Sequence, residues 1–251
     1  MAEFIPAIIA ALSIFSGGLM KGVLGIGAPL VTVPVLAHVY DVPTALAVMT
    51  VSLGVSSAWQ AWEHRRAPLA RRTLALVLVG SGAGVVVGTL FLGVADDAWL
   101  KIVLAVLVIS YVALHLTRPD LTISAPTAGR LALPAGLLTG VFQGTVGVST
   151  PVSVTFVLSQ GLKRDPYLLE TQSIFTVMAV SQIIALSAFG IMTPRLAAAA
   201  VAGLVPMMAG LWVGQRIADH VGNRAFEWLT LAVLSLIAAS LLLHAIPEAL
   251  V

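Results

Sequence analysis

A glycine-rich motif occurs twice in the chain at one constant separation. Gly18-x3-Gly22-x2-Gly25-x3-Pro29 returns as Gly140-x3-Gly144-x2-Gly147-x3-Pro151, with each matched residue 122 positions further on. That separation is close to half of the 251 residues. Duplicated glycine-rich interruptions in an apolar chain are typical of transporters built from two related halves. The motif therefore predicts two repeats, residues 1–120 and 121–251, within one integral membrane domain.

The composition places these repeats in a lipid bilayer. Hydrophobic residues make up 59% of the chain, charged residues only 10%, and the mean hydropathy is +1.04. Such a chain has too few polar side chains to cover a water-soluble globule of this size. Membrane crossing takes roughly 20 apolar residues. Six stretches reach about that length, namely residues 42–62, 73–94, 100–116, 167–189, 196–213 and 228–243.

Two further apolar segments, residues 30–37 and 152–159, directly follow the two motifs and are too short to cross alone. We therefore predict an all-α integral membrane protein with 8 to 10 helical segments. Each repeat begins with a broken-helix, re-entrant-like hairpin and continues with three transmembrane helices. Whether each hairpin is re-entrant or crosses fully stays open.

The basic residues indicate how the repeats are oriented. Ten of the thirteen Lys and Arg residues lie in four connections, and all four fall on one side if each hairpin enters and leaves on the same side: Arg65, Arg66, Arg71, Arg72, Arg118, Arg130, Lys163, Arg164, Arg216 and Arg224. The positive-inside rule makes that side cytoplasmic. Both termini and the turn at Asp96 then lie outside, where Arg195 is an exception. The two repeats start on opposite sides, which predicts an inverted-topology pair.

Several function classes are disfavoured. The chain has no cysteine, which excludes disulfides, thiolate metal sites and cysteine catalysis. Its five histidines show no metal-ligand spacing, and no catalytic or phosphate-loop motif is present. The basic residues form no nucleic-acid-binding face. We expect no enzyme activity, no metal, no cofactor and no nucleic-acid partner.

The motif itself predicts a break in each helix. Glycines four apart, as in Gly18 and Gly22, favour close helix packing. Gly25 and Gly147 differ because a proline follows four residues later, and proline is favoured in the first turn of a new helix. A half-helix that starts inside the membrane presents free N–H groups and the positive end of its dipole. Two such ends in a shared cavity favour an anion.

These considerations define a candidate substrate site. Lys21, inside the first motif, is either a counter-charge for the anion or a lysine that snorkels to an interface. Thr50 and Ser173 match in the repeat when one residue is inserted, and their hydroxyls are candidate hydrogen-bond donors to the anion. Ser149 and Thr150 are candidate N-terminal caps of the second short helix. Catalytic and metal residues are absent from this prediction. The predicted substrate-binding residues are Lys21, Gly22, Gly25, Ile26, Gly27, Ala28, Thr50, Gln143, Gly144, Gly147, Val148, Ser149, Thr150 and Ser173.

Two titratable residues have alternative interpretations. Glu170 lies near Lys163 and Arg164, so an interfacial ion pair is the simpler explanation and a proton-coupling carboxylate is the sharper one. His38, matched to Gln160 in the repeat, is either a helix-end cap or a group that titrates near neutral pH. Neither choice follows from the sequence.

At these motifs the chain resembles the TauE/SafE family of sulfite exporters, also called the toluene-sulfonate uptake permease group. The resemblance covers nearly the whole chain. The first copy, residues 18–34, matches well and includes Pro34. The second, residues 140–156, departs at Ser149 and Thr150 and has Phe156 in place of that proline.

The resemblance implies transport of a small sulfur-containing anion, such as sulfite, sulfoacetate, another organosulfonate or thiosulfate, across the bacterial inner membrane. Converging N–H groups favour an anion but do not select sulfur. A secondary transporter working by alternating access is our main hypothesis. An anion-selective channel and a non-transporting membrane scaffold are the alternatives. The direction of transport, coupling to protons or sodium, and homodimerisation stay open.

Overall fold

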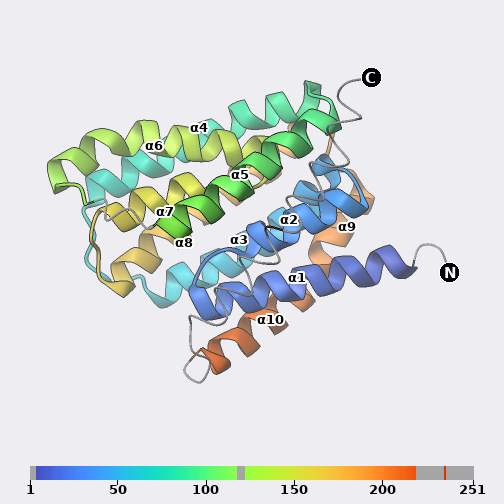
Figure 1. The fold of residues 1–251 in the computed structure, drawn as a ribbon, viewed down its shortest axis with the longest axis horizontal. Coiled ribbons are helices and arrows are strands. Elements are labelled where there is room, and N and C mark those ends of the chain that lie inside the picture. The colour runs from blue at the N-terminus through green and yellow to red at the C-terminus, as the bar shows by residue number, and fades with distance from the viewer. Residues whose placement is uncertain (1–3, 118–121, 219–234, 236–251) are drawn as a thin grey trace.

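A computed structural model describes residues 4–117, 122–218 and 235, and these form helices joined by turns (Figure 1). The first half contains α1 (Phe4–Leu24), α2 (Ala28–Val39), α3 (Val42–Glu63), α4 (Arg71–Val94) and α5 (Asp97–Thr117). The second half contains α6 (Ala125–Val146), α7 (Thr150–Ser159), α8 (Arg164–Ala188), α9 (Pro194–Ala202) and α10 (Leu204–Ile217). Each half thus opens with a long helix, a short helix and a further long helix, as the repeat predicts.

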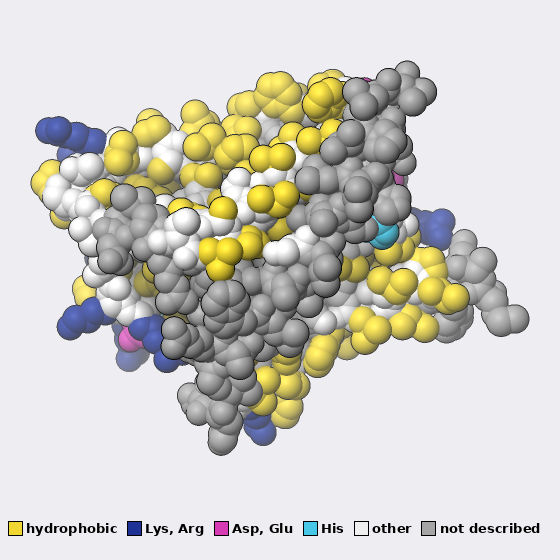
Figure 2. Space-filling model, viewed as in Figure 1, with side chains coloured by type: hydrophobic (Ala, Val, Ile, Leu, Met, Phe, Trp, Pro, Cys, Tyr) yellow, Lys and Arg dark blue, Asp and Glu magenta, His cyan; other side chains and the backbone are white. Residues whose placement is uncertain are grey.

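The chain is an all-α integral membrane protein. Six helical stretches among the described residues are long and apolar enough to cross a membrane: Ile5–Leu24, Val42–Glu63, Arg71–Val94, Asp97–Leu114, Arg164–Ala188 and Pro194–Ile217. Large apolar side chains are exposed on the outer faces of these helices, for example Val79 and Phe91 on α4 and Trp212 on α10. Figure 2 shows hydrophobic side chains across the middle of the molecule and Lys and Arg near its ends.

The helix boundaries agree with most of the predicted spans. The stretches 42–62, 73–94, 100–116 and 167–189 coincide with α3, α4, α5 and α8. Residues 196–213 form α9 and α10, which meet at Gly203. Other predictions lie outside the described residues: the stretch 228–243 apart from Ser235, the repeat boundary at 120, Arg118, Arg224 and the C-terminus.

The two hairpins enter the molecule from opposite ends. Ala7 of α1 and Tyr40, just after α2, line one cavity together with Arg195, so α1 and α2 begin and finish at the same end. At the other end, the Ile123 N–H before α6 donates to the Ser159 carbonyl at the end of α7 (2.8 Å). The halves are therefore inverted, as predicted.

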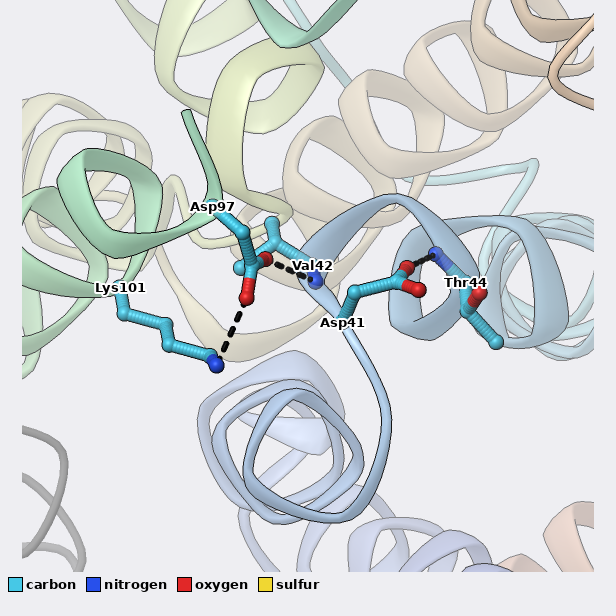
Figure 3. A network of polar contacts seen from close by, with 5 residues as sticks. All are labelled: Asp41, Val42, Thr44, Asp97 and Lys101. Atoms are coloured by element: carbon cyan, nitrogen blue, oxygen red, sulfur yellow. Dashed lines mark hydrogen bonds and ion pairs between the residues drawn. The ribbon is translucent and has the colours of Figure 1, made fainter. Parts of the chain in front are cut away.

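We call the first of these ends the acidic end, after Asp41 and Asp97. Asp41 caps its own helix, α3, by accepting a hydrogen bond from the Thr44 N–H (2.6 Å). Asp97, at the start of α5, accepts from the Val42 N–H (2.9 Å) and pairs with Lys101 (2.6 Å), as Figure 3 shows. Two carboxylates thus stabilise the N-terminus of α3, where the helix dipole favours negative charge.

The opposite end is basic. Arg66, in the connection between α3 and α4, lines a cavity with Lys163 and Arg164 at the start of α8. His64 Nδ1, just after α3, lies 3.3 Å from Asp165 Oδ1 in the first turn of α8. Two of the four basic connections that the sequence groups together are thus neighbours in space.

Glycines join the two halves along two seams. A Cβ atom on Gly18 or Gly22 of α1 would collide with the backbone of α10, at Met207 and Leu211. Likewise, a Cβ atom on Gly140 or Gly144 of α6 would collide with the backbone of α4. Each seam is completed by glycines on the partner helix, Gly84 and Gly88 of α4 and Gly210 and Gly214 of α10. Such close approach is the usual role of small residues in membrane helices.

These seams show how the halves interlock. The first helix of each half packs against a later helix of the other half, so α1 and α10 lie together along one edge of the molecule and α4 and α6 along the other (Figure 1). Between them α3 packs against α8, where a Cβ on Gly54 would lie 3.0 Å from the Ala179 side chain. The two hairpins, α1–α2 and α6–α7, are thereby held against the central helices α3 and α8.

Candidate substrate site at the two helix breaks

The first helix break comprises Gly25, Ile26 and Gly27, between α1 and α2. Gly25 and Gly27 have φ angles of 78° and 97°, in the left-handed region that favours glycine. Gly27 occupies the N-cap position of α2, and Pro29 is the second residue of that helix. All residues from Gly25 to Leu30 are buried. The predicted break is therefore present, inside the protein.

The second break comprises Gly147, Val148 and Ser149, between α6 and α7. Gly147 ends α6 with a φ of 73°, and Pro151 is the second residue of α7. Every residue from Val146 to Thr150 is buried. The two breaks thus have equal length, and Gly25 and Pro29 match Gly147 and Pro151, 122 residues later. They differ at the third residue, where Gly27 has a φ of 97° and Ser149 a φ of −116°.

Both breaks leave backbone donors without partners. Within the described residues, no hydrogen bond is donated by the N–H groups of Ile26, Gly27 and Ala28, or by those of Val148, Ser149 and Thr150. These groups are buried, where an unpaired N–H is costly. They also lie at the start of α2 and α7, where the helix dipole is positive. Six buried donors at two helix N-termini favour an anion.

Each break contacts the long central helix of the opposite half. A Cβ on Gly25 would lie 2.6 Å from the Leu168 side chain of α8, and one on Gly147 would lie 2.9 Å from Leu46 of α3. Gln172 of α8 donates its amide to the Gly25 carbonyl. The helices α3 and α8 therefore support the two breaks. The second break also meets the first hairpin, because a Cβ on Gly147 would lie 3.2 Å from the Val33 side chain of α2.

Lys21 adds a positive charge beside the first break. Its side chain is only 1% exposed and donates to Ser57 Oγ (2.6 Å) and Ser56 Oγ (3.1 Å) of α3. Within the described residues no carboxylate lies within 4.0 Å of its ammonium group. The interpretation that Lys21 snorkels to an interface is wrong, because the side chain turns inward to two hydroxyls.

Gln143, the residue matched to Lys21, lies in a neutral network. Its Nε2 donates to Gln182 Oε1 (3.3 Å), and Gln182 Nε2 donates to the Gln143 carbonyl (3.2 Å). Ser149 Oγ donates to Gln143 Oε1 (3.0 Å). Ser149 is at the N-cap position of α7 but makes no side-chain cap, so its expected capping role is wrong. The free N–H groups of α7 stay available.

Some buried polar atoms near the breaks also lack partners among the described residues. They are Thr150 Oγ1 on the first residue of α7, Gln172 Oε1 on α8 and Gln60 Oε1 on α3. Gln60 lies 122 residues before Gln182 and one turn after the two serines that bind Lys21. Sequence analysis missed Gln60 and the partners Ser56 and Ser57. Gln60 could have been identified from the sequence, because its separation from Gln182 equals that of the glycine motifs.

The remaining predicted site residues are less central. Gly22 and Gly144 line the packing seams, so close helix approach accounts for them. Thr50 donates to the Leu46 carbonyl of its own helix (2.5 Å). Ser173 is only partly buried. The one-residue insertion that pairs Thr50 with Ser173 is wrong in this region. Leu46 and Leu168 make equivalent contacts with the two breaks and are 122 residues apart. At the same separation, Thr50 corresponds to Gln172.

Glu170 does not form the expected surface ion pair. It is 1% exposed and accepts a hydrogen bond from Gln160 Nε2 (2.9 Å), and no Lys or Arg among the described residues lies within 4.0 Å of its carboxylate. His38, near the end of α2, is exposed. In the described part of the chain, no group of three or more His, Asp or Glu side chains is arranged to hold a metal ion.

A family model described as sulfite exporter TauE/SafE matches residues 9–241. The matched region contains both hairpins, both breaks and both glycine seams. No curated protein and no solved structure matches the chain.

Proposed function

Because the chain belongs to the sulfite exporter TauE/SafE family, we propose that it is a secondary transporter that carries a small sulfur-containing anion across the bacterial inner membrane by alternating access. The family implies a multi-pass membrane transporter of sulfite or related anions. The anion site, the mechanism and the orientation are the finer parts of the proposal.

The unpaired positive groups at the breaks carry this proposal. The backbone presents buried N–H groups at two helix N-termini, and Lys21 adds a buried ammonium without a carboxylate partner among the described residues. Burial of an ammonium group is expensive unless a counter-charge compensates it. An oxyanion supplies that charge and accepts hydrogen bonds from several donors at once. We therefore assign its binding to Gly25–Ala28, Gly147–Thr150 and Lys21.

The lengths of the short helices support a position of the breaks midway across the membrane. α2 has 12 residues and α7 has 10, which correspond to about 18 and 15 Å, or roughly half of a hydrocarbon core of about 30 Å. Because the two hairpins enter from opposite ends, rearrangement of one repeat against the other opens the same site to either side. We propose that the basic end faces the cytoplasm.

The leading test is anion-dependent thermal stability of the purified protein. Sulfite, sulfoacetate, sulfate, thiosulfate and taurine are compared at equal ionic strength, so that general salt effects cancel. A ligand at about 100 times its Kd stabilises the folded state by about 2.7 kcal/mol. We expect at least one sulfur oxyanion to raise the unfolding temperature. If none does, the proposed site loses its support.

Counter-flow separates the transporter from an anion-selective channel. Proteoliposomes are loaded with unlabelled sulfite and diluted into a trace of labelled sulfite. A transporter exchanges the two and accumulates label transiently, whereas a channel dissipates the gradient without this overshoot. A membrane scaffold shows neither flux nor anion-dependent stabilisation. The coupling ion, proton or sodium, is identified by repeating counter-flow under imposed gradients of each.

A further inference from the structure

Two cavities lie at equivalent places in the two repeats. The larger, about 570 Å³, opens near the acidic end and is lined by α1, α2, α3 and α9. The smaller, about 110 Å³, lies near the basic end and is lined by the starts of α4 and α6, by Gln160 after α7, and by α8. The repeat relates these two sets of helices: α1 corresponds to α6, α2 to α7, α3 to α8, and α9 to the start of α4.

Individual lining residues show the same correspondence. Leu69, Ala70 and Thr73 line the smaller cavity, and Arg195, Leu196 and Ala199, each 126 positions later, line the larger one. The seam glycines of α4 and α10 are also 126 positions apart. Tyr40 and Leu162, which follow the two short helices, line the larger and smaller cavity respectively and are 122 positions apart. The two cavities are therefore copies of one feature, one at each end.

Each cavity adjoins the central helix that supports a break. Ala45 lines the larger cavity, and the next residue, Leu46, contacts Gly147. Glu170 lines the smaller cavity between Leu168 and Gln172, which both contact Gly25. Each cavity thus borders the helix that forms the wall of a break.

The copies differ in charge. Among the residues that the structure describes, Arg195 is the only charged one that lines the larger cavity, and the corresponding residue of the smaller one is Leu69. In the smaller cavity, Glu170 is the only charged side chain from the described part of the chain. The residue 122 positions before it, Val48, lines the larger cavity. Arg195 is also the basic residue that the positive-inside rule leaves unexplained. The larger cavity therefore favours an anion at its mouth, and the smaller one carries a carboxylate.

We infer that these cavities are the two access routes to the helix breaks, and that Arg195 captures the sulfur oxyanion at the mouth of the larger route. This inference rests on the proposed function. Arg195 attracts the anion through its fixed positive charge and its several N–H donors. The anion then passes along α3 to the breaks. Glu170 repels an anion in the smaller route when ionised, so the two routes treat the same anion unequally.

Thiol accessibility tests this inference without requiring transport. The chain has no cysteine, so single cysteines can be introduced into the full-length protein directly. Ala199→Cys lies one turn after Arg195 in the larger cavity, and Thr73→Cys is its counterpart in the smaller. Each is treated with membrane-impermeant methanethiosulfonates, one carrying a sulfonate and one a quaternary ammonium. Val79→Cys, on the exposed apolar face of α4, is the control for lipid-facing positions.

We expect Ala199→Cys to react from one face of the membrane and Thr73→Cys from the opposite face, while Val79→Cys stays unreactive. Ala202→Cys and Ala128→Cys repeat the test at a second position in each cavity. Arg195→Gln should slow the sulfonate reagent at Ala199→Cys by about fivefold, as expected for roughly one charge a few ångströms away in a wet environment. It should accelerate the cationic reagent.

Two results would overturn the inference. One is that neither cysteine of a cavity reacts from the expected face. The other is that Arg195→Gln leaves the ratio of the two reagent rates unchanged. Failure of wild-type protein to exchange sulfite, with the accessibility pattern intact, would count against the proposed function alone.

Discussion

The two helix breaks begin with the same turn, but they differ at their third residue and in side-chain chemistry, since Gly27 has a φ of 97° and Ser149 a φ of −116°. Both turn at a glycine with positive φ, both start a short helix with proline in its first turn, and both leave three N–H groups without partners among the described residues. Beside the first break Lys21 contributes a charge held by two serines, whereas beside the second Gln143 joins an amide network. The duplicated breaks thus provide two positions that attract an anion. The charge of Lys21, which lies beside the first break alone, makes the two positions unequal.

The largest expected effect comes from the seams that hold the breaks in place. Gly22→Leu and Gly144→Leu should each cost about 3 kcal/mol or more, because the new side chain meets the backbone of α10 or α4 directly. We expect loss of monodisperse protein on size-exclusion chromatography in both cases. Gly93→Leu, where a Cβ meets nothing within 4 Å, is the matched control and should behave as wild type. If either variant still yields monodisperse protein, the seam at that glycine is not required to hold the two halves together.

Removal of the charge difference should weaken anion binding. Lys21→Gln makes the first break resemble the second, and loss of a charged hydrogen-bond donor costs about 1.5–3 kcal/mol. We expect sulfite affinity to fall about 10- to 100-fold, measured by titrating the rise in unfolding temperature. Lys101→Gln, which alters a partly exposed ion pair at the acidic end, serves as the control. An unchanged sulfite titration in Lys21→Gln would place the anion elsewhere.

The amide network of the second break should matter for stability more than for charge. Gln143→Leu leaves Gln182 and Ser149 without their partner, which we expect to destabilise the protein by about 1 kcal/mol in detergent unfolding experiments. Adding Gln182→Leu to Gln143→Leu removes the amide that the first substitution leaves without a partner. The double variant should therefore lose less unfolding free energy than the sum of the losses in the two single variants. Strict additivity would mean that the two glutamines do not interact in solution.

The smallest effect concerns the helices that support the breaks. Two carboxylates stabilise the start of α3, whereas Lys163 at the N-cap of α8 makes no side-chain cap. Asp97→Ala should cost about 1 kcal/mol, and Lys163→Ser should add about 0.5 kcal/mol. Unfolding midpoints of the two variants test this directly. A loss of stability in Lys163→Ser would indicate that the lysine has a role other than capping.

Local sequence chemistry predicted the breaks well. Glycine supplies the positive φ angles, and the prolines at 29 and 151 stand in the first turns of the short helices, so both positions follow from short-range rules. The inverted topology followed from the basic connections. The glycines of α4 and α10 were missed because their separation is 126 residues while that of the motif is 122, so a search at one offset does not detect them.

The partners of the site residues could not be predicted in this way. Whether Lys21 reaches an interface or turns inward depends on the neighbouring face of α3, which carries Ser56 and Ser57 at that level. The pairing of Gln143 with Gln182 is likewise a contact between separate helices. Hydrogen-bond geometry across helices depends on rotation and depth, which sequence spacing alone does not specify.

The seam between α1 and α10 also bears on biosynthesis. Gly22 packs against Leu211, so the first helix to leave the ribosome finds its partner only 189 residues later, roughly 10–40 s at about 5–20 residues per second. For α6 the partner, α4, has already been made. The second hairpin is thus able to dock as it emerges, while the first waits with a bare glycine face. A membrane chaperone that shields small-residue faces would be needed most by the N-terminal hairpin.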